Sequence, residues 1–214
     1  MTKAISVAES RDLDQKTINK VGIPSIVLME RAALNIYADL LSSKELDLTK
    51  VLILAGSGNN GGDALVVARL LETHGYDTNI LLVGNPNHRS KQMEKQLQIC
   101  DYYRVKHVFM NDDLTKYTMI VDGLFGSGLS RDVGGDFATV IDNANASGVK
   151  IHAVDIPSGL NGDTGEVMGT AIKATSTSTI AYPKKGMVKP EAKPYTGKIF
   201  IDDVGIYLND KYEE

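Results

Sequence analysis

The sequence predicts an α/β fold in which a mostly parallel sheet lies between two layers of helices. From residue 50 onward, segments typical of strands alternate with segments typical of helices. The runs 51–54 and 80–83 are continuously apolar, as is usual for parallel strands buried on both faces. This alternation is typical of a doubly wound sandwich with right-handed crossovers.

Two helices are expected before the sheet. The segment Ser6-Val7-Ala8-Glu9 has the form of a capping box and opens the first of them. Pro24 precedes the second, in which apolar residues recur at helical spacing. This N-terminal helical extension either covers a face of the sheet or forms an oligomer interface, and the sequence leaves both open.

The remaining elements follow from the same alternation. Strands are expected at 51–55, 78–83, 118–122, 150–155, 177–182 and 198–203, and helices at 62–74, 88–99 and 136–147. The 214 residues show no internal repeat, low-complexity tract or linker. We therefore expect a single domain spanning residues 1–214.

Composition excludes several classes of protein. A net charge of −4 argues against a nucleic-acid binder that relies on a basic surface. Residues 1–7 lack the apolar core of a signal peptide, and no apolar run approaches the roughly 20 residues needed to cross a bilayer. The single cysteine, Cys100, cannot form an internal disulfide and is expected to be a buried apolar residue. These features predict a cytoplasmic enzyme without a membrane partner.

A glycine-rich loop at residues 55–63 joins the first strand to a helix. This arrangement presents backbone N–H groups and the positive end of a helix dipole to an anion, usually a phosphate. Its glycines match the dinucleotide fingerprint G-x-G-x-x-G, but the second strand has Asp77 at its start and no acid at its end. That disfavours an ordinary NAD-dependent dehydrogenase. Gly62 and Asp63 stand where a Walker A loop needs Lys and Ser or Thr, which disfavours a P-loop NTPase.

The same loop carries more polar side chains than a phosphate cradle needs. A tight turn tolerates asparagine in left-handed conformations, and an aspartate favours a helix start. That simpler interpretation accounts for two of the polar residues. It does not readily account for Asn59, Asn60 and Asp63 together.

Two further glycine-rich loops follow later strands and are expected at the same edge of the sheet. Asp122 ends one strand, and Gly126-Ser127-Gly128 after it forms a possible nest for phosphate, with Arg131 adding charge. Asp155 ends another strand and is a candidate acid/base group. The alternatives are a glycine-rich connection with a solvated arginine, and an aspartate that caps a turn.

Other side chains near these loops suggest an ion site. Asn60, Asp122 and Ser158 offer oxygen ligands, which hard cations prefer, and no Cys/His cluster suits zinc. Lys184 and Lys185 follow a further strand, where one of them could meet a phosphate. Solvated lysines are the commoner outcome and are expected here.

Five segments in order resemble the NAD(P)H-hydrate epimerase family, the YjeF N-terminal domain. They are Leu-Met-Glu-Arg-Ala at 28–32, Gly-Asn-Asn-Gly-Gly-Asp at 58–63, Val-Asp-Gly-Leu-Phe-Gly-Ser-Gly-Leu at 121–129, Val-Asp-Ile-Pro-Ser-Gly-Leu at 154–160 and Tyr-Pro-Lys-Lys-Gly at 182–186. The resemblance extends through nearly the whole chain. Ala64, Ser127 and Asp132 depart from the commonest pattern.

The resemblance implies a Rossmann-like three-layer α/β/α sandwich and an isomerase that repairs nicotinamide cofactors. Such an enzyme interconverts the R and S forms of hydrated NADH and NADPH, and a separate dehydratase acts on the S form. The family is commonly dimeric, so a homodimer is expected. Fold alone does not secure activity, so a non-catalytic nucleotide-binding or protein-interaction module on the same fold is the alternative.

The resemblance also implies the roles of individual residues. One potassium ion per subunit is expected on Asn60, Asp122 and Ser158, and Asp155 is the expected catalytic acid/base. The expected substrate contacts come from the three loops: Asn59, Asn60, Gly61, Gly62, Asp63, Gly126, Ser127, Gly128, Leu129, Ser130, Arg131, Asp132 and Asp155.

Overall fold

A computed structural model of the chain describes residues 3–208. Within them the strands form one seven-stranded sheet in the order β3-β2-β1-β4-β5-β6-β7, with every neighbouring pair parallel. The order reverses between β1 and β4, and ligands of open α/β sheets bind beyond the carboxyl ends of the strands at such a point. The strands are β1 Lys50–Ala55, β2 Asp77–Leu82, β3 Lys106–Val108, β4 Met119–Gly123, β5 Lys150–Val154, β6 Ser176–Ile180 and β7 Lys198–Asp202.

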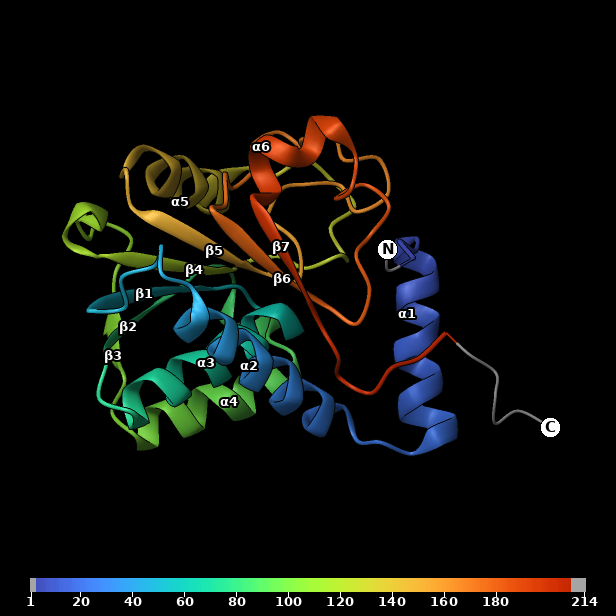
Figure 1. Cartoon of the computed structure of the whole chain (residues 1–214). Helices are drawn as coiled ribbons and strands as arrows, with labels where there is room; N and C mark the ends of the chain where they lie inside the picture. Colours follow the sequence, from blue (N-terminus) through green and yellow to red (C-terminus); the bar gives the residue numbers. More distant parts are fainter. Residues whose placement is uncertain (1–2, 209–214) are drawn as a thin grey trace.

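Helices cover both faces of this sheet. Figure 1 shows α2, α3 and α4 on one face and α5 and α6 on the other, which confirms the predicted α/β/α class. None of the helices within residues 3–208 has both the length and the apolarity needed to cross a bilayer. The α-helices are α1 Val7–Lys16, α2 Ser25–Ser42, α3 Asn59–Thr73, α4 Lys91–Tyr102, α5 Gly135–Ala146 and α6 Lys193–Thr196; the short turns are η1 Thr17–Val21, η2 Pro86–His88, η3 Leu114–Lys116 and η4 Pro190–Ala192.

All six predicted strands are present, with ends within two residues of the predicted ones. The prediction missed β3, a three-residue edge strand whose first two residues are exposed and which therefore shows no apolar run. Helix α3 begins at Asn59, three residues earlier than predicted, because Gly58 serves as its N-cap. Both asparagines of the glycine-rich loop therefore belong to the first turn of the helix.

The continuous apolar runs are explained by two cores, one on each face of the sheet. Ile53 of β1 packs with Leu65 of α3 in the core beneath α2, α3 and α4. Leu52 and Leu54 point the other way and join Ile141 of α5 in the second core. Successive residues of β1 thus contribute to one core and then the other, as expected for a strand covered on both faces.

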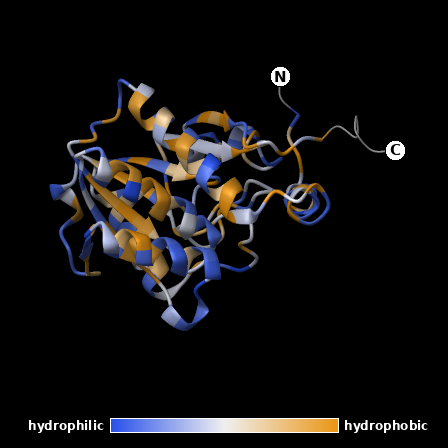
Figure 2. Ribbon diagram, turned by 90° about the horizontal axis from the view of Figure 1, so that it is seen from below, coloured by the Kyte–Doolittle hydropathy of each residue, from blue (hydrophilic) through white to orange (hydrophobic). Residues whose placement is uncertain are grey.

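The N-terminal extension covers the sheet with one helix and flanks it with the other. Helix α2 packs on the sheet face through buried residues such as Ile36. Helix α1 begins with the predicted capping box and stands at the margin of the domain, where Figure 2 shows it end-on. A small cluster that includes Leu13, Leu28 and Ile206 holds it there.

The turn from β1 into α3 depends on glycine at position 61. A Cβ atom at Gly61 would lie 2.0 Å from the carbonyl oxygen of Gly56, a backbone atom that cannot move aside. We expect Gly61→Ala to lower the free energy of unfolding by about 3 kcal/mol, as overpacking of a tight site does. Denaturant unfolding measures this change. Gly128→Ala is the control, because a Cβ atom there would have no other atom within 4 Å; an equal loss in both variants would contradict this explanation.

Candidate active site

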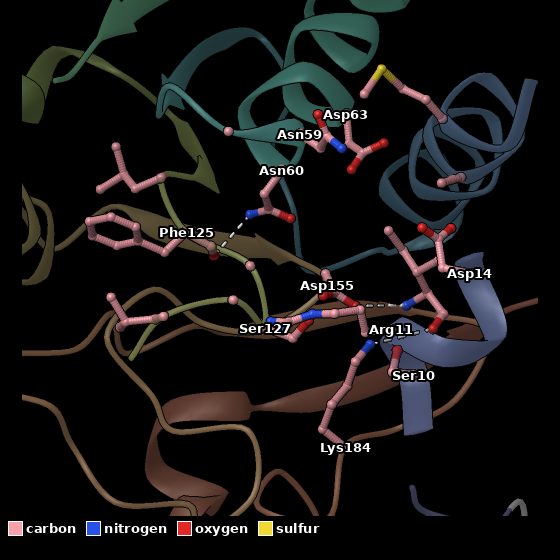
Figure 3. Close-up of a pocket in the computed structure, with 18 of the residues that line it drawn as sticks. Ser10, Arg11, Asp14, Asn59, Asn60, Asp63, Phe125, Ser127, Asp155 and Lys184 are labelled. Carbon is pink, nitrogen blue, oxygen red and sulfur yellow. Dashed lines mark hydrogen bonds and ion pairs between the residues drawn. The ribbon is translucent and has the colours of Figure 1, made fainter. Parts of the chain in front are cut away.

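A cavity of about 720 Å³ opens at the carboxyl ends of the central strands, where the strand order reverses. Three glycine-rich loops, predicted to meet at one edge of the sheet, all contribute to its wall. The cavity thus brings together most of the predicted site: Asn59, Asn60, Asp63, Gly126, Ser127, Gly128, Leu129, Ser130, Arg131 and Asp155. Figure 3 shows part of this wall, with Asn59, Asn60 and Asp63 coming from α3.

The N-terminus of α3 forms one side of the cavity. Gly58, the N-cap, makes no side-chain capping bond, so the first N–H groups of the helix are open to an anion. Residues 126–131 lie against it, since a Cβ atom at Gly126 would be 3.2 Å from the side-chain oxygen of Asn60. A helix terminus beside a glycine-rich loop is a suitable place for the phosphates of a nucleotide.

Three of the predicted substrate contacts do not line the cavity. Gly61 and Gly62 are buried in α3, where they pack against the carbonyl of Gly56 and the side chain of Met29. Their glycine identity is therefore explained by packing inside the protein. Asp132 is exposed, one residue beyond the part of the loop that lines the cavity.

Asn60, Asp122 and Ser158 meet around the backbone of Phe125. The Ser158 hydroxyl donates to Asp122 at 2.6 Å, and the Ser158 N–H donates to the other oxygen of that carboxylate at 2.8 Å. The Asn60 amide donates to the Phe125 carbonyl at 2.9 Å, which leaves its oxygen free to act as an acceptor. Complete burial raises the pKa of Asp122 to about 6, although the hydrogen bonds from Ser158 and Leu124 oppose the rise.

Asp155 forms an ion pair with Lys184. Asp155 has a left-handed backbone conformation, with φ of 65°, directly after β5. Its carboxylate accepts from the buried ammonium group of Lys184 and, at 3.3 Å, from the N–H of Ile180. Lys184 is 1% exposed and also lies 3.2 Å from the Thr179 hydroxyl. Both partners of the pair line the cavity.

The structure corrects the expectation that Lys184 is solvated. The chain reverses at Gly186, where a Cβ atom would be 2.4 Å from the carbonyl of Asn161, and this close packing holds the preceding residues inside the protein. The N-terminal segment adds backbone hydrogen bonds from Ile5 to Pro183 and from Lys185 to Ile5. Lys185 does remain at the surface, paired with Glu9 at 3.2 Å.

Two more carboxyl groups face the same end of the cavity. Asp63 comes from α3, where Figure 3 shows it next to Asn59, and Asp14 comes from α1. Burial is the main cause that raises the pKa of Asp63 well above its usual range, and the charges of Asp155 and Asp14 add to it. Burial and the charge of Asp155 also raise the pKa of Asp14. Asp14 was missed from the sequence, because no pattern there placed α1 beside the sheet edge.

The thiol of Cys100 and the imidazole of His152 do not line the cavity. The thiol of Cys100 is buried and donates to the carbonyl of Leu65 at 3.2 Å, and burial raises its pKa to about 12. His152 lies inside the sheet between Ser176 and Ser178, and burial lowers its pKa to about 3. Cys100 is thus the buried, unreactive residue that the sequence predicted.

The chain matches the model of a protein family described as "YjeF-related protein N-terminus" over residues 25–186. Among solved structures, the crystal structure of yeast ynu0, YNL200c, superposes with a TM-score of 0.75. That comparison covers 86% of this chain and 82% of the yeast chain at 23% sequence identity, so it shows a shared fold.

Curated relatives match over the full length. A protein of Lentilactobacillus buchneri named NAD(P)H-hydrate epimerase is 69% identical over 213 residues, which is 100% of this chain and 99% of that protein. A protein of the same name from Levilactobacillus brevis is 45% identical over 213 residues, with the same coverage. These comparisons confirm the resemblance seen in the sequence: the chain belongs to the family of YjeF-related protein N-terminal domains.

Proposed function

We propose that this chain is an NAD(P)H-hydrate epimerase, which interconverts the R and S forms of hydrated NADH and NADPH. The observation that carries the proposal is one cavity that joins an anion-binding helix terminus to the Asp155–Lys184 ion pair. The names of relatives as similar as 69% support the same reaction.

The two ends of the cavity suit the two ends of such a substrate. The phosphates are proposed to lie against the first turn of α3 and residues 126–131, where N–H groups and Arg131 favour negative charge. The hydrated nicotinamide ring then extends towards Asp155. Asn59 and Asp63, both on α3, line the cavity and are proposed to contact the substrate.

The reaction follows from the structure of the hydrate. The hydroxyl group sits on a carbon bonded to the ring nitrogen, whose lone pair can expel it and leave a planar cation. Water then returns to the opposite face of the ring. Asp155 is proposed to perform acid/base work on this hydroxyl group, and a carboxylate beside the ring also stabilises the cation. The Lys184 ammonium group holds Asp155 in place.

The cluster of Asn60, Asp122 and Ser158 fits a potassium ion. Asp122 is fully buried, and its hydrogen bonds come from Ser158 and Leu124, which are neutral donors, so a cation would compensate its charge. Oxygen ligands alone suit a hard cation. We propose that these three residues hold one potassium ion per subunit. When bound, the ion supplies fixed positive charge where the loops meet.

The biological setting is proposed from the family resemblance. We propose a cytoplasmic homodimer that passes the S form to a separate dehydratase. The exposed apolar side chains of Leu34 and Leu41 on α2, and of Ile201 on the edge strand β7, suit a surface covered by a second copy.

Incubating the protein with purified R-hydrate tests the proposed function. We expect the protein to form S-hydrate faster than it forms spontaneously. Chromatography measures both rates. We expect the rate to fall when potassium is replaced by tetramethylammonium at constant ionic strength, because that ion is too large for the cluster. No acceleration by the protein would contradict the epimerase proposal and favour a binding module. Equal rates in both salts would contradict the proposed role of potassium.

A further inference from the structure

Asp63 is a buried carboxyl group that faces the cavity and lacks a partner in the described structure. The residue is 8% exposed, lies in the second turn of α3 and lines the cavity. Across residues 3–208 its carboxyl oxygens make no hydrogen bond or ion pair. Its carboxyl group thus meets the cavity rather than a protein partner, which places it to contact water or a bound substrate.

The charged groups around Asp63 disfavour a second negative charge. Asp14 on α1 and Asp155 after β5 face it, and both raise its pKa in addition to burial. The buried cation at this end, Lys184, is bonded to Asp155. Arg11 on α1 also lines the cavity but is exposed, and α2 contributes the uncharged Met29. Burial and these neighbouring charges therefore favour the protonated form of Asp63, whereas Asp155 is paired with the Lys184 ammonium group.

This pairing matches what the proposed epimerisation requires. Expulsion of the hydroxyl group needs a proton donor, and the return of water needs an acceptor. Asp155 is paired with a buried ammonium group and suits the acceptor. Asp63 has no such cation beside it and suits the donor, as expected where an acid and a base of one site lie in different environments.

We infer that Asp63 is the catalytic proton donor of the epimerase, an inference that rests on the proposed function. The Asp63 proton moves to the hydroxyl oxygen, and the carbon–oxygen bond breaks with its electron pair, releasing water. The lone pair of the ring nitrogen forms the carbon–nitrogen double bond of the planar cation. A water molecule then bonds to the same carbon from the other face, and Asp155 accepts its proton. That proton returns to Asp63 through water in the cavity, so the cycle is balanced.

Asp63→Asn tests this inference, because it preserves size and removes the transferable proton. We expect the rate constant kcat to fall about 10²-fold or more, while KM stays within about twofold. We also expect Tm at pH 8 to rise by roughly 3 °C, because folding raises the pKa of this acid and so lowers stability above its unfolded pKa. Asp136→Asn, at an exposed position on α5, is the matched control.

Opposite changes in activity and stability separate a catalytic role from a structural one. A variant whose kcat and Tm both fall would assign Asp63 a structural role and overturn the inference. If Asp63→Asn does not fold, Asp63→Ala with added formate decides, because formate restores part of the rate only where a carboxylic acid is missing. If Asp63→Asn retains wild-type activity, the inference about Asp63 is overturned and the proposed function still stands. An inactive wild-type protein contradicts the proposed function itself.

Discussion

Asp155→Asn is expected to slow the interconversion of the R and S hydrates by about 10²-fold or more. The carboxylate at the end of β5 is the group proposed to exchange a proton with the substrate, and asparagine cannot do so at neutral pH. Asparagine is the suitable replacement because it tolerates the left-handed backbone that this position requires, with φ of 65°. The rate is measured by chromatography of the two hydrates, after subtraction of the spontaneous reaction.

The substitution keeps the backbone contacts of this position but leaves the buried Lys184 ammonium group without its ionic partner, so denaturant unfolding must first show that the variant is folded. The backbone N–H of Asp155 donates to the Ser178 carbonyl at 2.8 Å and is retained in the variant. Near-normal exchange in a folded Asp155→Asn protein would remove Asp155 from the acid/base role. A loss of activity with unchanged KM would place its contribution in the transition state.

Lys184→Met is expected to reduce both stability and activity. It removes the buried ammonium group and leaves the Asp155 carboxylate, whose side chain is 10% exposed, without its ionic partner. Removing one partner of a buried ion pair costs about 3 kcal/mol or more in the free energy of unfolding. We expect kcat to fall about 10-fold or more, because the unpaired carboxylate is no longer held in place. Denaturant unfolding and the hydrate assay measure the two effects.

The neighbouring lysine provides a matched control. Lys185→Met removes a surface pair with Glu9, in which the lysine side chain is 53% exposed, so both quantities should change little. The double variant Asp155→Asn, Lys184→Met should recover much of the lost stability, because it leaves no unpaired charge. If Lys184→Met and Lys185→Met behave alike, the ion pair does not have the importance assigned to it.

The sequence predicted the fold well because the runs at 51–54 and 80–83, in the centre of the sheet, are continuously apolar. Residues such as Ile53 and Leu54 pack into cores on opposite faces of the sheet, and this requirement is visible in the sequence itself. Strand β3 was missed because an edge strand with exposed residues needs no such pattern. The convergence of Asp122 and Asp155 was predictable, because both follow parallel strands and the carboxyl ends of such strands share one edge.

The rest of the site depends on contacts that sequence spacing does not reveal. Lys184 and Lys185 are adjacent and chemically identical, yet one is buried against Asp155 and the other is solvated. The difference lies in tertiary contacts, because the ammonium group of Lys184 meets a carboxylate 29 positions earlier in the sequence. Asp14 reaches the cavity because α1 docks beside it through a small apolar cluster. Gly61, which was expected to contact substrate, does not line the cavity and packs against the carbonyl of Gly56.

The central claim is that this cavity exchanges the hydroxyl group of a hydrated nicotinamide ring by its loss and return. Running the reaction from R-hydrate in water enriched in oxygen-18, and analysing the S-hydrate by mass spectrometry, tests that claim most directly. We expect enzyme-formed S-hydrate to carry one heavy oxygen, and we expect Asp155→Asn to lower the rate of labelling to near the spontaneous background. S-hydrate formed by the enzyme without the label would contradict it.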